Sequence, residues 1–99
     1  MFGIVEVKER HNIQYYFADV MIVSNRFLLI NSLDQDLKPF KEQINLLKIM
    51  DSIRVSFVDQ IKTLAFTLQE IQYLFTDSGE ALATYIEKEI KRIKREALS

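Results

Sequence analysis

Few side chains in this 99-residue sequence are of the types that carry out catalysis. His11 is the single histidine, and no cysteine or second histidine exists to complete a catalytic triad or a zinc site with it. Asp34 and Asp36 are two residues apart in a polar stretch, a spacing too common to indicate a metal site or an acid–base pair. We therefore expect His11 to be a solvated loop residue, and the protein to be non-enzymatic and without a cofactor or metal.

Phosphate binding by a glycine-rich loop is excluded as well. Gly3 and Gly79 are the only glycines, and each stands alone. The 13 Lys and Arg side chains are balanced by 14 Asp and Glu, giving a formal net charge of -1. Nucleic-acid-binding proteins usually carry a strong basic excess. We expect no nucleic-acid partner and no small-molecule substrate.

The composition predicts one packed domain covering residues 1–99. A chain of this length buries about 60–70% of its unfolded surface, which is too little to divide between two cores. Hydrophobic residues make up 48% and charged residues 27%, as in ordinary globular domains. The absence of cysteine fits a reducing compartment, and no apolar run matches a signal peptide or a membrane span. We expect a soluble cytoplasmic protein whose contact with any membrane is peripheral.

Alternating apolar residues predict extended segments along most of the chain. The clearest ones are residues 3–8, 13–23, 26–31, 63–68 and 71–75. Residues 9–12 form a polar loop, and Ser24 with Asn25 favours a tight turn. Gln69 and Glu70 turn the chain of a later hairpin. The first three segments therefore form a meander and the last two a second hairpin.

The C-terminal part predicts an amphipathic helix over residues 78–96. Asp77 and Glu80 have the spacing of a capping box, in which each side chain accepts a hydrogen bond from a free amide of the first turn. Apolar side chains follow at helical intervals, with Tyr85 beside them and the charged residues largely elsewhere on the wheel. These apolar residues are Leu82, Ile86, Ile90 and Ile93.

Residues 38–57, KPFKEQINLLKIMDSIRVSF, have two incompatible interpretations. A helix over residues 39–52 would give three strands, a helix, three strands and a helix, the order of longin-like or profilin-like domains. Two strands, at residues 43–47 and 53–57, would give seven strands and one C-terminal helix. Asp51 and Ser52 favour the second interpretation because they prefer turns, and the residues after them alternate. A seven-stranded antiparallel sheet must also curl, which leaves an open corner for a long amphipathic helix to fill.

Three runs of the sequence carry a family resemblance. VMIVSNRFLLINS, then QINLLKIMDSIRVSF after a polar loop, then IQYLFTDSGEALATYIEKEI resembles the pattern of pleckstrin-homology-like domains. The match covers nearly the whole chain and is similar to the divergent members in class I myosin tails and in leucine-rich-repeat actin-regulatory linker proteins. The resemblance implies a partly open seven-stranded barrel capped by helix 78–96. It also implies a cytoskeletal or trafficking setting.

Anionic lipid is the first ligand class that the resemblance implies. Lipid-binding members carry a lysine near the end of the first strand and two alternating basic residues on the second. Lys8 matches the first position, but residues 12–25 contain no lysine or arginine, which puts specific phosphoinositide recognition in doubt. A weaker attraction of about 1 kcal/mol per basic side chain remains if loop residues share one rim, the alternative being charges scattered for solubility. The residues of this expected rim are Lys8, Arg10, Arg26, Lys38 and Lys41.

A protein partner is the second ligand class. In phosphotyrosine-binding and related members, a groove between the fifth strand and the closing helix accepts an extended peptide as an added strand. The corresponding side chains here are Arg54, Ser56 and Val58 on the strand, and Tyr85 and Lys88 on the helix. Val58 and Tyr85 have the alternative role of completing the core. The run Tyr15, Tyr16 and Phe17 must also place at least one aromatic side chain on the outer face of the second strand, as a candidate interface anchor.

These patterns together predict a non-enzymatic interaction module. Its expected partner is a protein, or weakly an acidic membrane surface, in a cytoskeletal or trafficking assembly. Two alternatives stay open: a phosphoinositide-specific membrane-targeting domain, and a longin-like or profilin-like scaffold.

Overall fold

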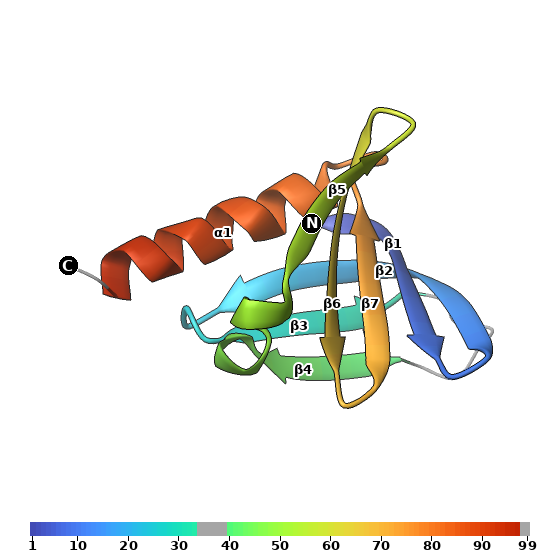
Figure 1. Cartoon of the computed structure of the whole chain (residues 1–99), viewed down its shortest axis with the longest axis horizontal. Helices are drawn as coiled ribbons and strands as arrows, with labels where there is room; N and C mark the ends of the chain where they lie inside the picture. Colours follow the sequence, from blue (N-terminus) through green and yellow to red (C-terminus); the bar gives the residue numbers. More distant parts are fainter. Residues whose placement is uncertain (34–39, 98–99) are drawn as a thin grey trace.

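The computed structural model describes residues 1–33 and 40–97, and it consists of strands followed by one helix (Figure 1). The strands are β1 (Phe2–Glu9), β2 (Asn12–Val23), β3 (Phe27–Ser32), β4 (Lys41–Asn45), β5 (Arg54–Val58), β6 (Ile61–Leu68) and β7 (Ile71–Thr76). The helix is α1 (Leu82–Ala97). Two 3-10 helices, η1 (Leu46–Lys48) and η2 (Met50–Ser52), connect β4 to β5.

The seven strands form one antiparallel sheet in the order β4-β3-β2-β1-β7-β6-β5. β4 and β5 are the two ends of this order, so the curled sheet stays open between them. α1 packs on β6, β7 and β2. The expected fold class is confirmed: the protein is mainly β, with seven strands and one C-terminal helix, consistent with a pleckstrin-homology-like barrel capped by a helix.

The ambiguous segment is not an α-helix, so the longin-like or profilin-like alternative is wrong. Residues Lys41–Asn45 are extended, and Ile44 pairs with Leu28 of β3. The strand has the predicted length but begins and ends two residues earlier, because residues 46–48 and 50–52 coil into η1 and η2. The side chain of Asn45 accepts a hydrogen bond from the Leu47 amide at 3.0 Å, which stabilises the first of these turns.

Tight turns connect β2 to β3 and β6 to β7 at the residues where the sequence predicts them. Ser24 and Asn25 have φ values of 54° and 53°, and Gln69 and Glu70 have 52° and 68°. Two consecutive positive φ values are typical of the two-residue hairpin turns whose twist matches that of the strands. The resulting hairpins fix the register that places one face of every long strand inward.

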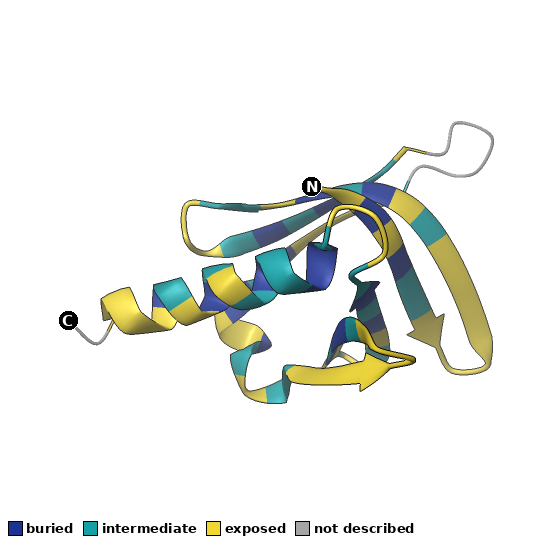
Figure 2. Ribbon diagram, turned by 90° about the horizontal axis from the view of Figure 1, so that it is seen from above, coloured by how far each residue is buried: buried dark blue, intermediate teal, exposed yellow. Residues whose placement is uncertain are grey.

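The inner face of the sheet and one stripe of α1 form a single core. Val5, Val20, Leu28 and Phe75 are fully buried from the sheet side. The helix contributes the predicted apolar residues, all of which are buried: Leu82, Ile86, Ile90 and Ile93. Burying one such side chain contributes about 1.5–3 kcal/mol, so α1 is held mainly by this stripe (Figure 2).

The helix begins later than predicted, at Leu82, and its cap differs from the expected capping box. Gly79 and Ala81 have φ values of 86° and 57°, which exclude them from a right-handed helix. The carboxylate of Asp77 accepts hydrogen bonds from the Thr84 amide, at 2.8 Å, and from the Thr84 hydroxyl. Glu80 instead accepts a hydrogen bond from the Phe2 amide of β1.

We expect Asp77→Ala to lower the free energy of unfolding by about 0.5–2 kcal/mol, the usual cost of losing a helix cap. Urea denaturation followed by circular dichroism measures this change. Asp51→Ala is the matched control, because Asp51 is exposed and its replacement should change the unfolding free energy by less than about 0.5 kcal/mol. Equal stability of the Asp77 variant and the wild type would contradict this assignment of the cap.

Candidate functional site

The structure separates one residue of the expected basic rim, Arg26, from Lys8 and Arg10. Lys8 lies in β1 and Arg10 in the β1–β2 turn, whereas Arg26 lies in the β2–β3 turn. These two turns are at opposite ends of β2, a strand of 12 residues. Lys41 begins β4 and pairs with Asn31, which in turn pairs with Asp19 near the middle of β2. The prediction that these side chains share one rim is therefore wrong for Arg26, which lies at the other end of β2 from Lys8 and Arg10, and Lys38 lies outside the described residues.

The barrel mouth beside Lys8 and Arg10 is acidic. A hollow of about 200 Å³ lies there, and among the described residues lining it the charged ones are Glu9 and Glu42. Tyr16 and Phe40 stack over it with ring centroids 4.4 Å apart. Burial, reinforced by the charges of Glu42 and Glu9, raises the pKa of Tyr73 to about 12. An anionic headgroup would meet carboxylates at this mouth.

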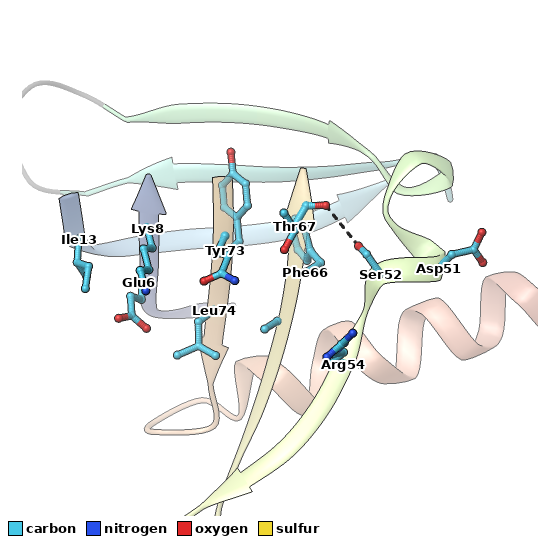
Figure 3. A pocket seen from close by; sticks show the side chains of 12 residues that line it. Glu6, Lys8, Ile13, Asp51, Ser52, Arg54, Phe66, Thr67, Tyr73 and Leu74 are labelled. Carbon is cyan, nitrogen blue, oxygen red and sulfur yellow. Dashed lines mark hydrogen bonds between the residues drawn. The ribbon is translucent and has the colours of Figure 1, made fainter. Parts of the chain in front are cut away.

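A larger hollow, of about 520 Å³, lies on the outer face of the sheet between β1 and β5 (Figure 3). It brings together Lys8, from the expected lipid-binding set, and Arg54, from the expected peptide-binding set. Glu6 and Asp51 also line it, so its formal charges cancel. One wall is fixed by the Ser52 hydroxyl, which donates to the Ile49 carbonyl at 3.0 Å and to the Thr67 carbonyl at 3.4 Å.

The three strand residues of the expected peptide groove lie on this outer face. Arg54 pairs with Ala65, Ser56 with Thr63 and Val58 with Ile61. The Ser56 hydroxyl lies 2.8 Å from the Thr63 hydroxyl, which also donates to the Ser56 carbonyl. Ser56 is therefore engaged within the β5–β6 hairpin. Arg54 and Val58 are exposed side chains.

The two helix residues of the expected groove point elsewhere. The Tyr85 hydroxyl accepts a hydrogen bond from the Ile22 amide of β2 at 3.1 Å, on the side of α1 away from β5. Tyr85 therefore helps to complete the core, which is the alternative role that the sequence analysis gave it. Lys88 is exposed, two positions along the helix from the buried Ile86 and hence roughly opposite the core stripe. Placing these two residues on the groove wall was wrong.

Glu87 is the helix residue that faces the β5–β6 hairpin, and the sequence analysis missed it. Its carboxylate pairs with the ammonium of Lys62, a residue of β6 that lies opposite Phe57 of β5. Both charged side chains are about one-fifth exposed. The sequence does indicate that Glu87 lies close to the sheet, because position 87 is next to the apolar stripe on the helical wheel. It does not show which flank of the helix faces β5.

β5 differs from the other strands in its exposure and in its position at one end of the sheet order. All five of its residues are exposed, and it pairs only with β6, which leaves its other edge free (Figures 1 and 2). Alternation suggested that Val55 and Phe57 face the core, yet they are 38% and 68% exposed. The reason is that the β5–β6 hairpin extends beyond the body of the sheet (Figure 1). An unpaired edge flanked by exposed apolar side chains can take up another extended chain.

Other site types find little support in residues 1–33 and 40–97. No helix in this part of the chain is both long and apolar enough to cross a membrane. Nor does it contain a group of three or more His, Asp or Glu side chains placed to hold a metal ion. A comparison of the chain with protein-family models finds no match, and neither does a comparison with curated proteins.

Proposed function

We propose that this chain is a non-enzymatic interaction module that binds an extended segment of a protein partner along the free edge of β5. The single observation that carries the proposal is that all five residues of Arg54–Val58, at the end of the sheet order, are exposed. The cytoskeletal or trafficking setting, in the cytoplasm, rests on the family resemblance alone.

Natural proteins usually protect a free sheet edge. They shorten it, place Lys or Pro on it, interrupt it with a bulge or cover it, because a free row of N–H and C=O groups pairs readily with another strand. β5 has five paired residues with no bulge in its register to β6, and it contains neither proline nor lysine. An edge left open in this way is suited to binding by strand addition, in which backbone hydrogen bonds provide affinity.

The two faces of β5 differ in polarity, and this difference predicts the sequence pattern of the bound segment. On the face of β5 that carries Val55 and Phe57, apolar side chains are exposed. On the opposite face, Arg54 borders the hollow that Lys8 also lines. A bound strand points alternate side chains to opposite faces. The fitting segment therefore alternates apolar residues with polar ones, and an acidic residue is favoured beside Arg54.

The same geometry favours a protein over an acidic membrane. Attraction to anionic lipid needs basic side chains that approach one surface together. Here Arg10 and Arg26 are at opposite ends of β2, and Glu9 and Glu42 line the mouth nearest Arg10. The hollow that contains Lys8 and Arg54 also contains two acidic side chains.

We expect peptides selected from a random library against the whole chain to shift the backbone amide resonances of Arg54–Val58. Phe57→Asp should weaken their binding by at least about tenfold, because the substitution places a charge beside the added strand. Titration calorimetry with the selected peptides measures the change in affinity. Peptides that shift amides only elsewhere would overturn the proposal.

Leu47→Asp provides a matched control for that experiment. Leu47 is 70% exposed, close to the 68% of Phe57, but it lies in η1 and not on the free edge. Its replacement should leave peptide affinity unchanged. Equal losses in the two variants would mean that general surface hydrophobicity, and not the β5 edge, binds the peptides.

We also expect vesicles containing about 5% of a phosphoinositide in neutral lipid to sediment no more of the protein than neutral vesicles do, because the described basic residues are dispersed. Co-sedimentation at physiological ionic strength measures this difference. Lys8→Ala together with Arg10→Ala should change nothing. Strong binding to one phosphoinositide, lost in the double variant, would support the lipid-targeting alternative instead.

A further inference from the structure

The outer face of β1 and β2 is apolar and is not covered by any described part of the chain. Six large apolar side chains gather there, each between 43% and 64% exposed: Phe2, Ile4, Ile13, Tyr15, Phe17 and Leu33. We call this set the outer apolar face. It lies opposite the face on which α1 packs, because the inward residues of the same strands, such as Val5 and Ala18, are fully buried.

Register and contacts show that this face is continuous. Ile4 pairs with Phe17 across β1 and β2, and the rings of Phe2 and Phe17 stack with centroids 6.4 Å apart. The Leu33 amide donates to the Phe17 carbonyl at 2.8 Å, which places Leu33 beside the same aromatic residue. Phe2, Ile4, Phe17 and Leu33 line one wide, shallow hollow. Phe17 is thus the centre of the face.

The charged groups at the face have an excess of only one acidic group, because Glu80 also lines the hollow, where it accepts a hydrogen bond from the Phe2 amide. Asp19, at one margin, is paired with the Met1 amino group at 3.2 Å. Glu6 and Lys8 follow each other along the outward side of β1 at the other end, and Glu6 accepts a hydrogen bond from the Tyr15 hydroxyl. A strongly charged partner would find no matching charge here. A second, identical face brings an excess of only one acidic group, and the whole chain carries a formal charge of only -1, so two copies repel each other little.

The size of the face is also adequate for self-association. Large apolar and aromatic side chains each offer about 150–250 Å², so six of them at the exposures given above present on the order of 500 Å². A stable interface buries about 800 Å² per partner. The six side chains supply more than half of this area, and the polar margin supplies the remainder, as in known interfaces.

We propose that the outer apolar face is a dimer interface, on which a second copy of this chain packs sheet against sheet about a two-fold axis. An isologous contact of this kind uses the same patch twice. The central Phe17 of each copy then packs near the partner's Ile4 and Leu33. The interface uses neither edge of the sheet, and Ile13 is the one member of the face that also lines the hollow beside Arg54.

Sedimentation velocity of the whole chain over about 10–500 µM tests this proposal. The wild type should shift from monomer to dimer, and Phe17→Glu should weaken association by at least about tenfold. Phe57→Glu is the matched control, since it places the same charge on an exposed aromatic residue of β5 and should leave the dimer intact. Circular dichroism verifies that the variants are folded.

A second variant and a second measurement cover the case in which Phe17→Glu fails to fold. Tyr15→Lys replaces the most exposed member of the face, at 64%, and should also weaken the dimer. In a mixture of isotope-labelled and unlabelled wild-type chains, intermolecular NOEs should connect the Phe17 ring to methyl groups of Ile4 and Leu33. A wild type that stays monomeric over the whole range overturns the proposal, and so does a dimer that Phe57→Glu dissociates and Tyr15→Lys does not.

Discussion

Closure of an open seven-stranded sheet by one helix is the constraint on which the rest of this structure depends. The sheet order leaves β4 and β5 unpaired with each other, and α1 covers the inner face of the curled sheet by packing on β6, β7 and β2. The apolar stripe from Leu82 to Ile93 provides the burial. Specific polar contacts then fix the orientation of the helix on the sheet.

These contacts hold α1 at its start and on both of its flanks. Asp77 caps the first turn, and Tyr85 satisfies the amide of Ile22 in a part of β2 that extends beyond β1. On the other flank, Glu87 pairs with Lys62 of β6. Near the far end, Arg92 donates to the side chain of Asn25 in the β2–β3 turn at 2.7 Å. Because α1 is held on the inner face, it covers neither the outer apolar face nor the free edge of β5.

Much of the fold could be predicted from the sequence because its signals are local. Alternation located the long strands, Ser24 with Asn25 and Gln69 with Glu70 located two turns, and the helical spacing of the apolar residues located α1. The start of α1 was missed because Ala81 adopts a left-handed conformation that nothing in its side chain favours. The bounds of β4 were predicted two residues too late, because Ile44 and Leu46 are buried whether residue 46 continues the strand or begins a 3-10 turn.

The candidate site was less predictable because it depends on non-local geometry. Alternation in β5 suggested that Val55 and Phe57 face the core, but alternation does not report whether a hairpin extends beyond the sheet it belongs to. Helical spacing placed Tyr85 near the apolar stripe but could not decide which strand lies beside each flank. The basic residues were individually in or near loops, and only the length of β2 shows that two of those loops are far apart.

The two proposed surfaces are centred on different strands and meet only at the hollow that Ile13 and Arg54 both line, and this arrangement has a consequence for binding. The outer apolar face is centred on β1 and β2, whereas β7 and β6 lie between β1 and the free edge of β5. A dimer formed through the outer face therefore leaves two β5 edges free. Addition of one short strand gives limited affinity, because ordering the bound segment offsets much of what its backbone hydrogen bonds contribute. Two edges held in one dimer make the second contact effectively intramolecular, which raises affinity for a partner with two suitable segments without any new type of contact.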